Sequence, residues 1–261
     1  DDAASLFGDA EELKIEKPVP PALTVEPDIL EVLQREKDVV GMYLSDHPLK
    51  KYEFELENFT NCKMAELGDL IADCDKNRQT AQVAVAGLVT SVETKISRNG
   101  KPFAKVNVED FSGIYEFAFF GKDYENFMNY LHEHTAIYIE GEICEKYFLK
   151  PEEITAGKKA PYTFKVKKIS LLGNVAEDRL TGFAIEMLAN DITPELRHKL
   201  VHLVKEYSGK IPLSMIVFDP VTNYIVEFIS RKYHITVSAD FILQLNELGL
   251  KYRVSRKNLS S

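Results

Sequence analysis

The chain has 261 residues, of which 45% are hydrophobic and 10% aromatic, so most of it can form buried cores and global disorder is excluded. At roughly 100 to 150 residues per domain, this length predicts two compact domains with additional tails. No run of about 18 apolar residues is present, so no membrane span is expected. The chain starts at Asp1 without a signal segment, which indicates a fragment or processed product.

The formal net charge of −9 comes from one part of the chain. Residues 1–60 hold 15 acids and 6 bases, residues 61–173 hold 16 and 15, and residues 174–261 hold 10 and 11. Because the acidic excess lies in the first sixty residues, the net charge does not exclude a nucleic-acid partner for the rest. The three cysteines, Cys62, Cys74 and Cys144, fit neither a disulfide framework nor a CxxC metal site, which favours a reducing cytosol.

The first 79 residues predict a tail followed by helices. Residues 1–26 mix acids and prolines around one apolar island, Leu6-Phe7, and are expected to be a disordered tail. Residues 27–79 are expected to be a helical linker region. Its predicted parts are a helix from about 28 to 47, a short helix over 49–59 and a polar connector near 73–79.

From residue 80 the hydrophobic period changes to two, which is typical of β-strands. Alternating residues predict two strands joined by a hairpin at Asn99-Gly100. Three strands, a short helix and two more strands over residues 80–173 are the element order of an OB-fold, a five-stranded β-barrel. The predicted elements are strands at 81–89, 103–108, 114–120, 136–143 and 162–169, with a helix at 123–131.

Residues 174–261 predict a C-terminal mixed α/β domain. Thr193 and Ser238 each precede a helical pattern and are expected to cap helices. The chain as a whole is therefore expected to be multi-domain: a disordered tail, a short helical linker, the barrel and this last domain. The predicted strands of the last domain are 180–188, 211–218, 224–229 and 251–254.

The residues that indicate a function lie on the barrel. Between Thr94 and Val108 there are four bases and no acid, and alternation places Phe103 on the same face as Lys105. OB-folds bind oligonucleotides at strands 2 and 3 and between the first and fourth loops, with cations for phosphates and aromatic rings for bases. Phe117 and Phe119 are further stacking candidates. The predicted single-stranded DNA site consists of Lys95, Arg98, Lys101, Phe103, Lys105, Lys158, Lys159, Lys165 and Lys167.

No catalytic or metal site is predicted. No strand gathers the two or three carboxylates that a nucleotidyl-transfer centre needs, and neither a P-loop nor a nucleophile elbow is present. His198 and His202 are one helical turn apart but have no third ligand nearby in the sequence.

One segment resembles a known family. Residues 36–49, EKDVVGMYLSDHPL, resemble the signature EK(E/D)-x-x-G-x-YLSGHPL of the C-terminal third of the bacterial replicative DNA polymerase III alpha subunit, with Asp46 in place of the usual glycine. Further matching segments are Gly87-Leu88-Val89, the run NGKPFA at 99–104, Glu109-Asp110 and Ser112-Gly113.

The resemblance implies partners that the residues alone do not. In that family the segment upstream of the signature binds the sliding clamp, and Ser5, Leu6 and Phe7 lie at the matching place, with Ala3 where the family usually has Gln. The family's OB domain is implicated in binding the single-stranded template, and in some members the last domain docks onto the tau subunit of the clamp loader. The catalytic aspartates with their Mg²⁺ belong to a palm domain in the rest of the polymerase chain. The resemblance thus implies a non-catalytic, cofactor-free part of a cytoplasmic bacterial polymerase.

Three alternatives stay open from the sequence. The barrel could be an architectural or protein-binding module, or an RNA-binding barrel like those of aminoacyl-tRNA synthetases. The enzyme alternative is a phosphatase or nuclease, for which a metal-dependent activity screen is expected to be blank.

Overall fold

The computed structural model describes residues 47–147, 149 and 157–259. The predicted tail over 1–26, the first linker helix and the clamp-binding residues Ser5, Leu6 and Phe7 lie outside the described residues. The described part begins at His47. Pro48 and Leu49 are buried, and a 3₁₀ turn (Lys50–Tyr52) and helix α2 (Glu53–Phe59) follow.

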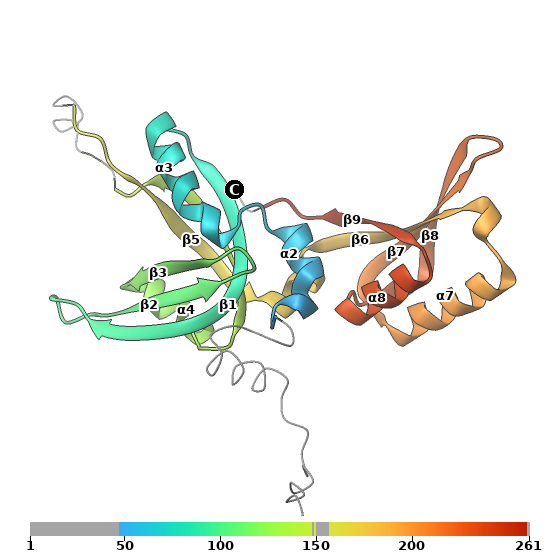
Figure 1. Cartoon of the computed structure of the whole chain (residues 1–261), viewed down its shortest axis with the longest axis horizontal. Helices are drawn as coiled ribbons and strands as arrows, with labels where there is room; N and C mark the ends of the chain where they lie inside the picture. Colours follow the sequence, from blue (N-terminus) through green and yellow to red (C-terminus); the bar gives the residue numbers. More distant parts are fainter. Residues whose placement is uncertain (1–46, 148, 150–156, 260–261) are drawn as a thin grey trace, which may run out of the picture. The chain divides into compact units, whose positions relative to one another are not determined.

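A five-stranded antiparallel sheet follows, in the order β3-β2-β1-β4-β5 (Figure 1), and the predicted OB-fold barrel is confirmed. The helix between β3 and β4 is the short α4, which continues into a 3₁₀ turn (Met128–Tyr130). The element bounds are β1 (Ala81–Ile96), β2 (Pro102–Glu109), β3 (Ile114–Phe120), α4 (Lys122–Phe127), β4 (Ala136–Glu145) and β5 (Tyr162–Leu171).

Strand β2 has the alternation that the sequence predicts. Ala104, Val106 and Val108 are fully buried, whereas Phe103 and Lys105 are only partly buried. The first hairpin turns at the predicted Asn-Gly pair: Gly100 has φ 74°, and its N–H donates to the Ser97 carbonyl at 2.9 Å. This left-handed conformation costs glycine little because it has no Cβ.

Strands β1 and β2 approach each other closely at Gly87. A Cβ at this position would lie 2.5 Å from the Glu109 carbonyl oxygen and 2.8 Å from Val108 Cγ1. Any larger residue would therefore push β2 away from β1, which gives the Gly-Leu-Val segment a structural reason.

A second, mixed sheet of order β8-β7-β6-β9 forms the predicted α/β part. β6 and β7 are parallel, and β8 and β9 pair antiparallel with their neighbours. The predicted caps are confirmed: Thr193 accepts a hydrogen bond from the Leu196 N–H at 3.1 Å, and Ser238 from the Phe241 N–H at 3.2 Å. The elements are β6 (Leu180–Leu188), α7 (Pro194–Glu206), β7 (Ser208–Asp219), β8 (Tyr224–Ile235), α8 (Ala239–Glu247) and β9 (Lys251–Arg256).

The described residues have two hydrophobic cores. One fills the barrel and includes Val85, Val106 and Ile139. The other begins on the outer side of β1 and β4 and continues through α2 into the second sheet, where α7 and α8 cover one face. The barrel and the second sheet are therefore packed through a shared core, while the boundary near residue 173 stays a prediction.

The predicted polar connector near 73–79 is wrong, because helix α3 (Leu67–Asn77) runs through most of it. Leu67 and Cys74 are buried in the barrel core, and Leu70 and Ile71 pack against it. The polar residues from Asp73 to Asn77 lie in the last turns of an amphipathic helix. Another short helix, α6 (Val175–Arg179), was not predicted either.

Glu55 on α2 is a buried acid. Its side chain is 4% exposed, and its Oε2 has no hydrogen-bond partner among the described residues. Burial raises the pKa of Glu55 from 4.5 to about 7, because a carboxylate loses its hydration in a low-dielectric site.

This pKa predicts a pH dependence of stability. Between pH 4.5 and about 7 the folded chain retains a proton that the unfolded chain releases, so the free energy of unfolding should fall as pH rises through this window and then level off. Glu55→Gln should remove the fall and add about 2 to 3 kcal/mol at pH 8. Urea denaturation at pH 5 and pH 8 measures it, with exposed Glu57→Gln as the control. Equal pH dependence in the wild type and Glu55→Gln would contradict the assignment.

Candidate nucleic-acid interface

Only part of the barrel's outer surface is open. Ala84, Ala86, Leu88 and Tyr138, on the outer side of β1 and β4, belong to the core shared with α2 and the second sheet. The open part is the outer face of the second half of β1, of β2 and of β3. We call this the open barrel face; its residues are Glu93, Lys95, Phe103, Lys105, Glu116 and Phe120.

Two stacked phenylalanines occupy one end of the open barrel face. Phe103 and Phe120 are register partners on β2 and β3, with ring centroids 4.9 Å apart and an interplanar angle of 18°. Phe120 is 56% exposed, whereas Phe117 and Phe119 are buried in the barrel core and cannot stack on a base. The pair thus presents a flat aromatic surface to solvent, the kind on which bases stack.

The two lysines beside this aromatic pair form ion pairs with glutamates. Lys95 Nζ lies 2.6 Å from Glu93, and Lys105 Nζ lies 2.7 Å from Glu116. The hydrogen bond and charge of Glu116 raise the pKa of Lys105, and those of Lys95 lower the pKa of Glu93. Residues 94–108 contain no acid, but carboxylates outside this stretch pair with its lysines. Glu93 directly precedes the stretch, and Glu116 lies on the neighbouring strand β3.

The other two basic residues of the first hairpin lie at its tip. Arg98 and Lys101 are exposed, and neither side chain has an ion pair within the described residues. Lys95 and Phe103 are register partners across β1 and β2. The structure thus brings together five of the predicted residues: Lys95, Arg98, Lys101, Phe103 and Lys105.

The loop before β5 is anchored by Arg78. Its guanidinium donates to the Ala160 carbonyl at 2.9 Å and to Glu145 at 2.5 Å and lies 4.8 Å from the Tyr162 ring centroid. Lys159 lines a hollow of about 420 Å³ beside α3, together with Lys76 and Arg78. Lys159 therefore lies beside α3. It and Lys158 belong to the loop between β4 and β5, whereas the aromatic pair of the open barrel face lies on β2 and β3.

Lys165 and Lys167 lie on β5, which is separated from β2 by β1 and β4. Lys165 donates to the Glu145 carbonyl at 2.7 Å, and Lys167 pairs with Glu142 at 3.0 Å. These two predicted residues are not brought onto the open barrel face.

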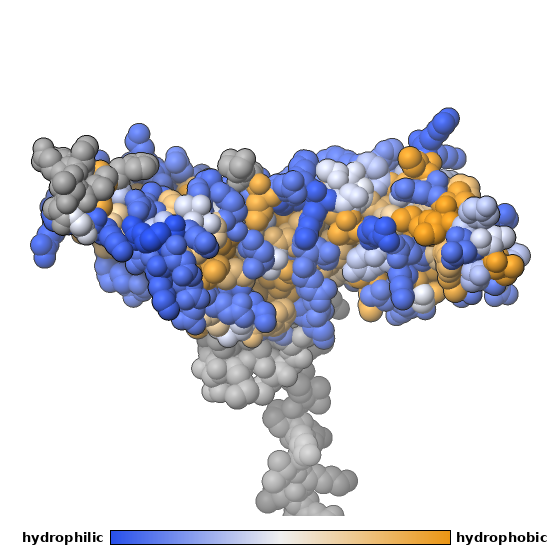
Figure 2. Space-filling view, turned by 90° about the horizontal axis from the view of Figure 1, so that it is seen from above, coloured by the Kyte–Doolittle hydropathy of each residue, from blue (hydrophilic) through white to orange (hydrophobic). Residues whose placement is uncertain are grey.

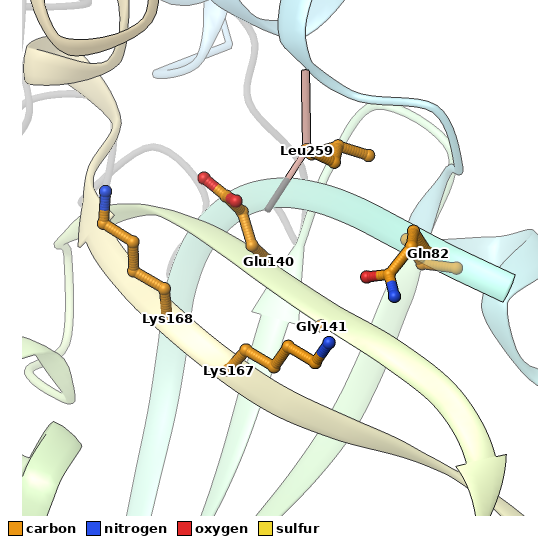
Figure 3. A pocket seen from close by; sticks show the side chains of 7 residues that line it. Gln82, Glu140, Gly141, Lys167, Lys168 and Leu259 are labelled. Atoms are coloured by element: carbon orange, nitrogen blue, oxygen red, sulfur yellow. The ribbon is translucent and has the colours of Figure 1, made fainter. Parts of the chain in front are cut away.

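A small hollow of about 250 Å³ lies next to these lysines (Figure 3). In Figure 3 the ammonium groups of Lys167 and Lys168 point away from each other, with Glu140 and Gly141 on the neighbouring strand. Glu140 is held by Arg179 at 2.5 Å, and Lys167 by Glu142.

Sequence reasoning missed three residues of this face: Phe120, Glu93 and Glu116. Phe120 and Glu116 meet their partners across β2 and β3, which the sequence does not show, whereas Glu93 is two residues before Lys95 on β1, a spacing that the sequence does contain. Within residues 47–147, 149 and 157–259, no three His, Cys, Asp or Glu side chains gather as metal ligands. No helix of the described part is both long and apolar enough to cross a membrane.

Two family models match the chain. Residues 83–172 match the OB-fold nucleic acid binding domain, and residues 183–255 match the DNA polymerase III alpha subunit, C-terminal domain. The chain resembles the C-terminal region of the DNA polymerase III alpha subunit. The alpha subunit of Saccharopolyspora erythraea is 28% identical over 198 residues, which are 73% of this chain and 15% of that subunit.

Other alpha subunits agree. That of Haemophilus influenzae is 24% identical over 191 residues, again 73% of this chain and 15% of the subunit. That of Pseudomonas aeruginosa is 28% identical over 222 residues, 85% of this chain and 17% of the subunit. The chain thus spans less than a fifth of these relatives.

A solved structure, the mitochondrial single-stranded DNA binding protein Rim1 of S. cerevisiae, is similar over 36% of this chain and 97% of its own, at 17% identity and a TM-score of 0.25. This similarity is too low to support an argument about function.

Proposed function

We propose that this chain is the non-catalytic C-terminal part of a replicative DNA polymerase alpha subunit and that its barrel binds single-stranded template. The observation that carries the proposal is the stacked pair Phe103 and Phe120 beside the two unpaired cations of the hairpin tip. All four residues lie on or next to the open barrel face, which the other described residues leave uncovered.

The mechanism is one of positioning. A base stacks on Phe120, and the flanking phosphates reach Arg98 and Lys101. Because Lys95 and Lys105 are paired with carboxylates, few counterions are released, and affinity comes mainly from stacking at about 1 to 3 kcal/mol per base. Such binding is modest and reversible, which suits a template that must move through the site. No metal takes part, since Mg²⁺ is expected only at the palm domain.

The first test separates phosphate contacts from general charge. In Arg98→Ala/Lys101→Ala, the salt slope of log K for an oligo(dT) should fall by about 1.4, or about 0.7 for each lost phosphate contact on a single strand. Fluorescence anisotropy at several salt concentrations measures the slope.

The matched control is Lys199→Ala/Lys205→Ala, which removes two exposed lysines of α7 and changes the net charge equally. Its slope should equal that of the wild type. An unchanged slope in the hairpin variant, or an equal fall in the control, would overturn the barrel assignment.

A competition experiment addresses the RNA alternative. Single-stranded DNA should displace labelled oligo(dT) at lower concentrations than a folded tRNA does. A stronger displacement by tRNA would favour an RNA-binding barrel, and the absence of any nucleic-acid binding at low salt would favour a protein-binding module.

The proposal includes two further partners, the sliding clamp and the tau subunit of the clamp loader, and a cytoplasmic bacterial setting. The support is the family resemblance, with Ser5, Leu6 and Phe7 as the clamp motif and the last domain as the contact for tau. A clamp-bound segment of this kind would raise the effective concentration of the polymerase at the primer terminus and so make synthesis processive.

Leu6→Ala/Phe7→Ala is expected to abolish capture of this chain by the sliding clamp of the same organism, because two apolar anchors lose their contacts. Surface plasmon resonance with immobilised clamp measures this. Leu13→Ala/Ile15→Ala, in the same acidic segment, should bind like the wild type. Undiminished capture of the first variant would place the clamp motif elsewhere.

A further inference from the structure

Strand β8 exposes apolar side chains that the proposed template binding does not use. Tyr224, Ile225, Val226, Phe228 and Ile229 are between 48% and 75% exposed. Five of the six residues from 224 to 229 are thus large, apolar and accessible. Apolar side chains are visible among polar ones around the second sheet and its helices, on the right of Figure 2.

The backbone of β8 is open as well. The strand is the last in the order β8-β7-β6-β9, so its outer edge pairs with no strand of the described chain. Exposed edges of this kind are templates for pairing with another strand, and folded proteins usually protect them.

The open face of the sheet next to β8 is hollowed. A groove of about 500 Å³ has small residues on its floor, among them Gly182, Ala184 and Ser214, and Ile216, Glu227 and Ile229 along its β7 and β8 side. A strand added at the edge would extend the sheet beyond β8, with alternate side chains next to Ile229 on the face that carries this groove and the others on the opposite face.

The charged residues near the β8 edge indicate the charge that a partner should carry. From Val221 to Lys232 the hairpin has one acid, Glu227, and two bases, Arg231 and Lys232. Arg231 is exposed, and its side chain has no ion pair or hydrogen bond in the described part of the chain. An acidic residue on the partner would satisfy it.

A second copy of the chain fits less well. Directly opposed residues of an antiparallel pair lie on the same face of the sheet, so a copy paired over residues 224–229 would place Glu227 opposite either Glu227 or Ile225 of the other copy. The first register opposes two like charges, and the second sets each glutamate against an apolar side chain.

We propose that the edge of β8 binds an extended, apolar and acidic segment of another protein by β-strand addition. The main chain of β8 supplies hydrogen bonds, Ile225, Phe228 and Ile229 supply apolar contacts, and Arg231 pairs with a carboxylate. The inference does not depend on template binding. It concerns the domain that is also proposed to contact the clamp loader, but it does not require that contact.

The test uses a fluorescein-labelled peptide of about ten residues, alternating Val and Thr with two Asp at one end. Its binding to the full chain is followed by anisotropy. Ile225→Lys/Ile229→Lys should weaken binding by about tenfold or more, because lysines on an edge strand oppose pairing. Leu243→Lys, at an exposed apolar position on α8, is the matched control and should bind like the wild type.

Reversing the charge at Arg231 separates a loss of binding from a loss of folding, because the same variant should bind one peptide more weakly and another more tightly. Arg231→Glu should bind the Asp peptide more weakly and a peptide with Lys in place of Asp more tightly. No binding to the wild type, or equal binding by all variants, would overturn the inference. Concentration-dependent dimers in sedimentation, lost in Ile225→Lys/Ile229→Lys, would overturn it in favour of a second copy. Binding of oligo(dT) should be the same in all these variants, so that failure here leaves the template proposal intact.

Discussion

Arg179→Met is expected to lower the free energy of unfolding by about 3 to 5 kcal/mol, because it leaves a buried carboxylate without a partner. Arg179 and Glu140 are 8% and 5% exposed, and their closest atoms, Nη1 and Oε1, are 2.5 Å apart. Arg179 also donates to the Lys257 carbonyl at 2.8 Å. One side chain of α6 thus connects barrel strand β4 with the segment after β9.

The control for this prediction is an exposed pair. Lys105→Met breaks the contact with Glu116 and should leave the free energy of unfolding close to that of the wild type, since exposed ion pairs contribute little. The double variant Arg179→Met/Glu140→Leu should regain most of the loss, because no unpaired charge is left. Urea denaturation followed by circular dichroism measures all three. A loss in Arg179→Met no larger than that in Lys105→Met would show that the buried pair does not stabilise the chain.

Phe120→Ala is expected to weaken oligo(dT) binding by about tenfold, or about 1.4 kcal/mol, within the range for one lost base stack. Its salt slope should stay at the wild-type value, because no phosphate contact is removed. This combination distinguishes the ring from the hairpin cations, whose removal changes the slope.

Phe111→Ala is the matched control for the stacking prediction. Phe111 has the same exposure as Phe120, 56%, but lies in the turn between β2 and β3, where it contacts the His47 ring at 4.6 Å. Its removal should leave oligo(dT) affinity unchanged. Equal affinity of Phe120→Ala and the wild type would remove the aromatic pair from the site.

Much of the fold could be predicted from local patterns. The period of two identified the barrel strands, Asn99-Gly100 identified the first turn, and Thr193 and Ser238 identified two helix starts. Helix α3 was missed although its signal is present: Leu67, Leu70, Ile71 and Cys74 have helical spacing. Its polar last turns resemble a connector in sequence, because the residues from Asp73 to Asn77 are mostly charged or polar. The five residues of α6 are too few for a periodic pattern.

For the candidate site, the sequence could predict only which residues of one β-strand share a face. Alternation correctly placed Phe103 and Lys105 on one face of β2. The contacts of Phe120 with Phe103 and of Glu116 with Lys105 depend on the register between β2 and β3. The separation of Lys165 and Lys167 from that face depends on the order of strands in the sheet, which follows from the whole barrel.

The shared core on the outer side of β1 and β4 limits how freely this barrel could be exchanged between proteins. A barrel grafted here from another OB-fold protein would have to bring apolar residues at the positions of Ala84, Ala86 and Leu88 and an aromatic residue at Tyr138. It would also need an acid at the position of Glu140 for Arg179. An engineer who wishes to alter the ligand of this barrel should therefore keep its β1 and β4 surface and replace only the hairpin and the outer residues of β2 and β3.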